Sequence, residues 1–147
     1  MVSEEERKSI DQVCTKYEIR NYSINADGSI DVDGNVDFNW SRLDRIPLKF
    51  NRVSGFFDCA YNSLSSLDGC PVSVGGFFDC KYNKLSSLDG CPVSVGGFFD
   101  CRFNSLTSLK GCPTNVSGFD CSNNNLTSLE FCPTEIGGDF LCRNNQL

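Results

Sequence analysis

Cysteine is the reactive residue that recurs most regularly in this chain of 147 residues. Nine of the ten cysteines fall into two columns with a spacing of 20 or 21 residues: Cys59, Cys80, Cys101, Cys121 and Cys142, and Cys70, Cys91, Cys112 and Cys132. Such thiols could bind a metal, form disulfides or pack as small apolar side chains. Zinc sites usually contain paired C-x-x-C ligands or histidine, and this sequence has neither. We interpret the cysteines as structural thiols and expect no metal or cofactor, with metal binding and disulfides as the less favoured alternatives.

Acidic, basic and aromatic residues recur with the same period on what should be the concave strand face. Nine of them are the candidate binding residues: Asp58, Tyr61, Asp79, Lys81, Tyr82, Asp100, Arg102, Phe103 and Asp120. The aspartates are Asp58, Asp79, Asp100 and Asp120. Two residues after them come Ala60, Lys81, Arg102 and Ser122, and Arg143 continues this second column. The next column holds Tyr61, Tyr82, Phe103, Asn123 and Asn144, and another holds Phe56, Phe77 and Phe98. Aromatic residues surrounded by charges are typical of interface hot spots. The competing interpretation is that Lys81 and Arg102 only neutralise the aspartates and that duplication copied the residues.

Catalysis has little support in these motifs. The chain has no histidine and no G-x-S-x-G motif. Carboxylates repeated along one strand face also lack the contrasting environments that make one an acid and another a base. We therefore expect a protein that is not an enzyme.

The period itself predicts the fold. Repeats of about 20 residues indicate a solenoid, because one coil cannot bury its apolar face without its neighbours. Alternate strand residues should point inward, which places Phe57, Cys59, Leu64 and their repeat mates in the core. An asparagine column should satisfy backbone groups at the bend after each strand: Asn62, Asn83, Asn104, Asn124 and Asn145. Glycine pairs such as Gly75–Gly76 precede the strands, and we expect them to provide unusual backbone angles at a turn or bulge.

The repeat F-x-C-x-x-N-x-L-x-x-L-x-x-C-P-x-x-V-x-G resembles the leucine-rich repeat of the short bacterial type, over roughly residues 41–147. This resemblance implies a mainly β repeat solenoid of right-handed coils with 20–21 residues each. The stretches DGSIDVDGNVDFNW and IPLKFNRVSGFFDC, within residues 25–60, are similar to small repeat proteins of tailed bacteriophages. That similarity implies a viral protein with a role in host interaction or counter-defence.

The residues before the clear repeats are predicted to start the solenoid. Residues 1–20 read as a capping helix, with Ser3 as N-cap, Glu6 completing a capping box, and an apolar stripe formed by Ile10, Val13, Cys14 and Tyr17. The alternative is a helix that binds a membrane surface or a partner. Residues 21–56 read as a strand-rich lead-in with a degenerate first repeat, and residues 57–147 as the main solenoid, which is open at its C-terminus.

The lead-in contains an acidic run that is similar to a calcium loop: Asp27, Asp31, Asp33, Gly34 and Asp37. An EF-hand loop that starts at Ser29 would need glutamate at its twelfth position, where this chain has Trp40. We therefore favour Asx turns over calcium binding.

Charge and composition limit the classes of molecule that could be the partner. The net charge of −6 argues against nucleic acid, which requires a basic surface, and no apolar run is long enough to span a membrane. We predict a non-enzymatic protein-binding module for a host protein with a basic surface, acting in the cytoplasm, because no apolar signal-peptide core precedes the charged run Ser3–Lys8. The alternatives are a small-molecule sponge of nucleotide type and a self-associating assembly protein, for example a homodimer through the uncapped C-terminal coil.

Overall fold

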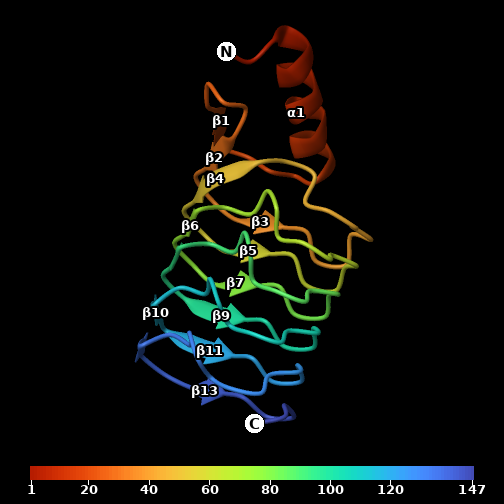
Figure 1. Ribbon diagram of the computed structural model, residues 1–147. Helices are drawn as coiled ribbons and strands as arrows, with labels where there is room; N and C mark the ends of the chain where they lie inside the picture. The colour runs from red at the N-terminus through yellow and green to blue at the C-terminus, as the bar shows by residue number, and fades with distance from the viewer.

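The computed structural model describes residues 1–147 and shows a β-solenoid with one N-terminal helix (Figure 1). Helix α1 spans Glu4–Lys16. The strands of the first sheet are β1 (Tyr22–Ile24), β2 (Ile30–Val32), β4 (Phe50–Val53), β6 (Ser73–Val74) and β8 (Ser94–Val95), continued by the pair β10 (Asn115–Val116) and β12 (Glu135–Ile136). The strands of the second sheet are β3 (Val36–Asp37), β5 (Phe57–Asp58), β7 (Phe78–Asp79), β9 (Phe98–Asp100), β11 (Gly118–Asp120) and β13 (Phe140–Leu141).

The second sheet, which we call sheet B, fixes the register of the coils. Its six strands are all parallel, and each pairs only with the same strand of the coils before and after it. Phe57 lies beside Phe78, and Asp58 beside Asp79, so the columns of the sequence become columns in space. Sheet B begins at β3, whose Asp37 pairs with Asp58. The first coil therefore takes its strand from the lead-in.

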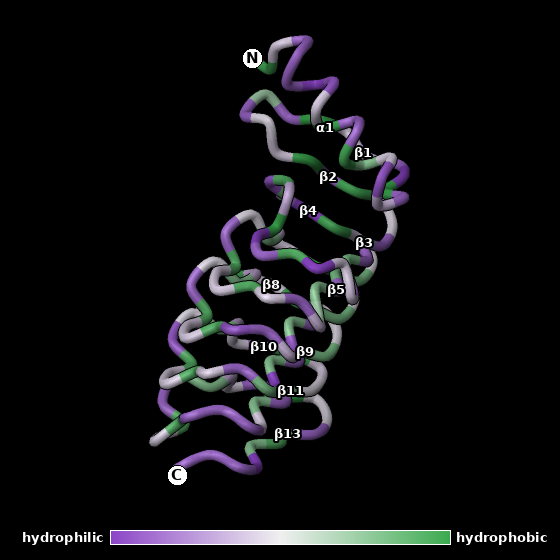
Figure 2. Tube along the Cα trace, turned by 90° about the vertical axis from the view of Figure 1, so that its right-hand side faces the viewer, coloured by the Kyte–Doolittle hydropathy of each residue, from purple (hydrophilic) through white to green (hydrophobic).

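The core is a continuous column of stacked side chains between the two sheets. Phe57, Phe78, Phe99 and Phe119 are fully buried, and neighbouring rings are 5.2–5.9 Å apart. The tube in Figure 2 shows hydrophobic stretches recurring at the strands of successive coils, with hydrophilic turns between them. All ten cysteines are free thiols, and those of the first column up to Cys121 are fully buried, as the structural interpretation requires.

The asparagine column joins the coils as predicted. Asn83 Oδ1 accepts a hydrogen bond from the backbone N–H of Leu64 at 2.9 Å. Its Nδ2 donates to the carbonyl oxygens of Cys59 and Cys80 at 3.0 and 3.1 Å. Asn104 repeats this pattern one coil later. Each amide therefore satisfies both its own bend and that of the preceding coil.

Helix α1 covers the N-terminal end of the core. Ser3 Oγ accepts from the backbone N–H of Glu6 at 3.1 Å, so the predicted N-cap is confirmed. Cys14 is buried, and the ring of Tyr17 packs edge-on against Phe38 with centroids 5.0 Å apart. The polar face of the helix is left outside, as a cap requires.

The predicted reason for the glycine pairs is wrong. Gly75 and Gly96 do not have positive φ angles. The limit is the room for a side chain between consecutive coils. A Cβ on Gly75 would lie 2.2 Å from the carbonyl oxygen of Ser54, and a Cβ on Gly96 would lie 2.3 Å from the carbonyl oxygen of Gly75. Glycine is needed here because consecutive coils approach so closely.

Candidate functional site

Four aromatic rings form an exposed stack beside sheet B, which we call the aromatic ladder: Trp40, Tyr61, Tyr82 and Phe103. Neighbouring ring centroids are 4.3, 4.6 and 4.2 Å apart, and the interplanar angles are 10–11°. Three of these residues were predicted as binding residues, and the structure brings them together. Trp40 was not among them because it lies in the lead-in, before the clear repeats begin at Phe57. Its distance of 21 residues from Tyr61 is the signal that could have found it.

Every ladder residue has left-handed backbone geometry. The φ angles are 56° for Trp40, 55° for Tyr61, 54° for Tyr82 and 53° for Phe103. Large side chains rarely adopt this conformation, whereas asparagine does so readily. The next two coils place Asn123 and Asn144 at the same position, with φ angles of 58° and 53°. The first four coils therefore carry aromatic rings where the backbone favours asparagine.

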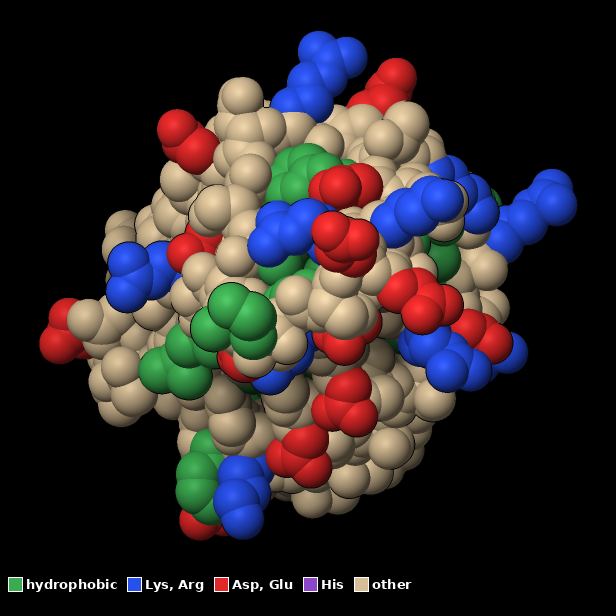
Figure 3. All heavy atoms as spheres, turned by 90° about the horizontal axis from the view of Figure 1, so that it is seen from above, with side chains coloured by type: hydrophobic (Ala, Val, Ile, Leu, Met, Phe, Trp, Pro, Cys, Tyr) green, Lys and Arg blue, Asp and Glu red, His purple; other side chains and the backbone are tan.

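The ladder rings are accessible from solvent. Trp40 is 69% exposed, and Tyr82 and Phe103 are 39% and 37% exposed. A shallow groove of about 600 Å³ runs along the ladder and is lined by Trp40, Arg42, Tyr61, Asn62, Ser63 and Tyr82. Seen from the N-terminal end, acidic and basic side chains are scattered over the surface, with hydrophobic side chains among them (Figure 3).

Three of the four predicted acidic binding residues are not freely exposed. Asp79, Asp100 and Asp120 are 6%, 7% and 4% exposed, so little of these three predicted binding residues faces solvent. The Oδ1 atom of each accepts a hydrogen bond from the backbone N–H two residues later, as in Asp100 with Arg102 at 3.1 Å. These are Asx turns, and they hold the carboxylates against the backbone.

Basic side chains lie over the buried carboxylates and bridge adjacent coils. Lys81 Nζ lies 2.7 Å from Asp79 Oδ2 and 3.9 Å from Asp100 Oδ2. Arg102 Nη2 lies 2.8 Å from Asp100 Oδ2, and its Nε lies 3.3 Å from Asp120 Oδ2. Burial raises the pKa of Asp100, although the hydrogen bond from Arg102 opposes this. Neutralisation by Lys81 and Arg102 therefore accounts for this part of the column.

Asp58 lacks such a cation. Its Oδ1 accepts from the backbone N–H of Ala60 at 2.9 Å, and the residue at the position equivalent to Lys81 is Ala60 itself. Burial raises the pKa of Asp58 to about 6, and the nearby charges of Asp79 and Asp37 act in the same direction. The partly buried carboxylate of Asp58 and the exposed Asp37 thus form the acidic end of the surface.

Asp58→Asn is expected to remove a pH-dependent loss of stability. The folded-state pKa near 6 lies above the value of about 3.9 for an unfolded chain, so the free energy of unfolding falls as the pH rises between these two values. Thermal midpoints of the wild type and the variant, measured from pH 4 to pH 7, should diverge in favour of the variant. Asp68→Asn, at an exposed position, is the matched control. Equal pH profiles of the wild type and Asp58→Asn would contradict the assignment.

The second aromatic column is shorter than predicted. Phe56 and Phe77 stack with centroids 4.6 Å apart. Phe98 lies instead over Gly118, where an added Cβ would come within 2.5 Å of its ring. The coil of β11 is one residue shorter and has Gly118 at the position of Phe98, so no phenylalanine continues the column. We therefore centre the candidate site on the ladder.

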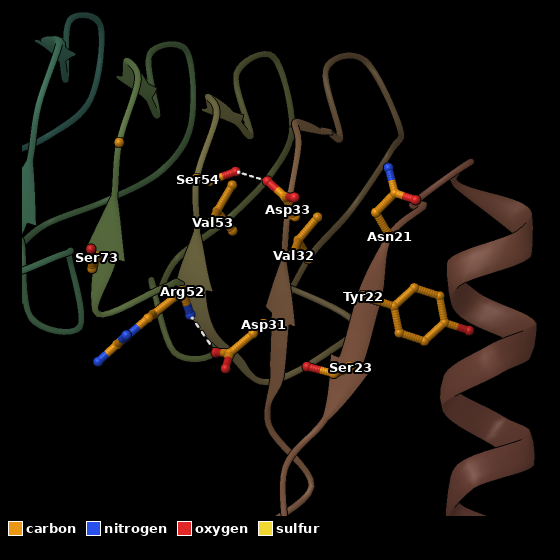
Figure 4. A pocket seen from close by; sticks show the side chains of 11 residues that line it. Asn21, Tyr22, Ser23, Asp31, Val32, Asp33, Arg52, Val53, Ser54 and Ser73 are labelled. Atoms are coloured by element: carbon orange, nitrogen blue, oxygen red, sulfur yellow. Dashed lines mark hydrogen bonds between the residues drawn. The ribbon is translucent and has the colours of Figure 1, made fainter.

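A hollow of about 610 Å³ on the other sheet contains several polar side chains that form hydrogen bonds with neighbouring strands or with α1 (Figure 4). Asp31 accepts hydrogen bonds from Asn51 Nδ2 and the backbone N–H of Arg52, and Asp33 accepts one from Ser54 Oγ. Tyr22 points toward α1, where it donates to Asp11. These contacts hold the first coils together.

Asp27, in the predicted acidic run, is engaged in the same way. It accepts from the backbone N–H and hydroxyl of Ser29 and pairs with Lys49 at 3.1 Å. These hydrogen bonds lower the pKa of Asp27. The loop is an Asx turn, as we predicted from the sequence.

Two findings concern the chain as a whole. The single helix is too short to cross a membrane. No protein-family model, curated protein or solved structure matches this chain.

Proposed function

We propose that this solenoid is a non-enzymatic protein-binding module whose contact surface is the aromatic ladder. Exposed tyrosine and tryptophan side chains that are held rigidly contribute a large share of binding energy at protein interfaces. The stack holds each ring in place, so little side-chain entropy remains to be lost when a partner binds. The ladder is therefore pre-organised for contact.

Trp40 is the observation that carries this proposal. Its coil is not a copy of the later ones, because it has Val36 and Phe38 where the next coil has Phe57 and Cys59. The core residues have changed, yet the left-handed position still holds an aromatic ring, and a larger, more exposed one. Simple duplication does not account for that retention. Left-handed geometry costs a bulky residue roughly 1–2 kcal/mol, which a binding role would justify.

The spacing of the rings favours a macromolecular partner over a planar small molecule. The ring centroids are 4.2–4.6 Å apart, so neighbouring rings already contact each other and the planar base of a nucleotide cannot fit between them. What remains accessible is a row of ring edges and the outer face of Trp40. An extended polypeptide matches such a row. The host protein expected from the resemblance to phage proteins stays a prediction.

Selection from a displayed library of random peptides tests this proposal. The comparison variant carries asparagine at all four ladder positions, as Asn123 and Asn144 do naturally, so its backbone is expected to keep the left-handed geometry. We expect peptides that bind the wild type at least about tenfold more tightly than this variant. Circular dichroism and thermal unfolding verify that the variant is folded. Recovery of peptides that bind both proteins equally would overturn the proposal.

A further inference from the structure

We infer that the N-terminal end of this surface binds a lysine or arginine side chain of the partner at Asp37 and Asp58, next to Trp40. This inference rests on the proposed function and specifies the chemistry of the partner. It combines three features: a repeated arrangement that holds a cation elsewhere in the chain, two carboxylates without that cation, and an exposed aromatic ring beside them.

The later coils show how the arrangement works. A basic residue two positions after the aspartate lies between the carboxylate of its own coil and that of the next coil: Lys81 between Asp79 and Asp100, and Arg102 between Asp100 and Asp120. The site accepts both an ammonium and a guanidinium group. Both cations are only partly exposed, with side chains 21% and 36% accessible. Partial burial strengthens such pairs relative to fully exposed ones.

The first two coils have the same carboxylates and backbone but no basic residue two positions after the aspartate. Asp37 pairs in register with Asp58, and Asp37 Oδ1 accepts from the N–H of Asn39 at 2.9 Å, as Asp79 does from Lys81. The residues that correspond to Lys81 are Asn39 and Ala60, which carry no charge. Across the whole column, two basic side chains face five aspartates. A cation from outside would complete the series.

The aromatic ladder adds a second source of attraction. Lys81 Nζ lies 5.8 Å from the ring centroid of Tyr61, which belongs to the preceding coil. Trp40 lies in the coil of Asp37, directly after Asn39, and is 69% exposed. Tryptophan is the best aromatic partner for a cation. A basic side chain placed between Asp37 and Asp58 would therefore lie beside an exposed indole ring.

The fluorescence of Trp40 can report binding at this site, because Trp40 is the only tryptophan in the chain. The probes are two acetylated and amidated hexapeptides of glycine, serine and leucine, identical except that one holds arginine and the other its neutral isostere citrulline. We expect the arginine peptide to change Trp40 fluorescence with at least about tenfold higher affinity than the citrulline peptide, and the difference to shrink with added salt.

Two variants locate the site. Asp58→Asn removes the carboxylate, and Asn39→Lys places a cation between Asp37 and Asp58 from within the chain, at an exposed position. Both are expected to weaken binding of the arginine peptide about tenfold and to leave that of the citrulline peptide unchanged. Asn39→Lys should also unfold at a higher temperature than the wild type, so its loss of binding cannot arise from misfolding.

The outcomes separate this inference from the proposed function. Equal affinity of the arginine and citrulline peptides for the wild type would overturn the inference, and so would unchanged arginine binding in Asn39→Lys. Neither result would affect the ladder-dependent peptide selection, which tests the proposed function by itself. A selection that shows no dependence on the ladder would overturn the proposed function instead.

Discussion

Asn83→Ala is expected to lower the free energy of unfolding by about 3 kcal/mol or more. The substitution leaves the backbone N–H of Leu64 without a partner. It also removes one hydrogen bond from each of the carbonyl oxygens of Cys59 and Cys80, which keep their bonds from Asn62 and Asn104. An unsatisfied buried N–H costs about 1–3 kcal/mol, and each of the other two lost hydrogen bonds contributes about 0.5–1.5 kcal/mol. Because Leu64, Cys59 and Cys80 are themselves buried, water has little access to replace the amide.

Urea unfolding measures this effect, since the free energy of unfolding falls linearly with denaturant concentration. Asn125→Ala is the matched control: it removes the same side chain from an exposed position, and we expect a change within about 0.5 kcal/mol. Asn83→Asp keeps the acceptor for Leu64 but loses both donors, so it should also be strongly destabilised. If Asn83→Ala and Asn125→Ala unfold at the same urea concentration, the asparagine column does not hold the coils together.

Such a break matters more in a solenoid than in a globular domain. Each coil contacts only its neighbours, so the stability of the array depends on every interface between coils. Asn83 bonds to the coil before it, and Asn104 repeats the link one coil later. Loss of one link separates the N-terminal coils, which carry the candidate site, from the C-terminal ones.

The sequence predicted the core well because each core position is present several times. The phenylalanine, cysteine, leucine and asparagine columns repeat at 20 or 21 residues, and parallel pairing in register keeps them aligned. The first coil was harder to recognise. It exchanges the sizes of two core residues, with Val36 and Phe38 in place of Phe57 and Cys59, so the cysteine that identifies the other coils is absent. The total volume is similar, and the core accepts the exchange.

The exposure of the aspartates could not be predicted from strand alternation. Strand alternation predicts that the side chains of Asp79 and Asp100 point away from the core. It does not predict whether other side chains cover them. Lys81 and Arg102 fold back along the same face and cover the carboxylates. Accessible carboxylates in this column remain at Asp37 and Asp58, which have no basic residue two positions later, and the coil of Asp37 also holds the most exposed ring. The candidate site is therefore smaller than the sequence suggested and lies nearer the N-terminus.

Gly96→Ala is expected to destabilise the solenoid by about 2–3 kcal/mol, although the same substitution stabilises many proteins. Alanine restricts the unfolded chain, which favours folding by about 0.4–1 kcal/mol where the native backbone accepts it. The backbone angle of Gly96 is compatible with alanine, because its φ is not positive. The obstacle is the carbonyl oxygen of Gly75, only 2.3 Å from the new Cβ. Two coils would have to move apart, and overpacking of this kind costs about 1–3 kcal/mol or more.

Gly137→Ala separates the steric effect from the entropic one. Gly137 occupies the corresponding corner of a later coil, and a Cβ there would lie 3.6 Å from the carbonyl oxygen of Ser117, at ordinary contact distance. Thermal unfolding of both variants should therefore give opposite shifts, with a lower midpoint for Gly96→Ala and an equal or higher one for Gly137→Ala. Equal shifts would mean that the separation of the coils does not limit this corner. Opposite shifts would show that close approach between coils, rather than an unusual backbone angle, selects glycine here.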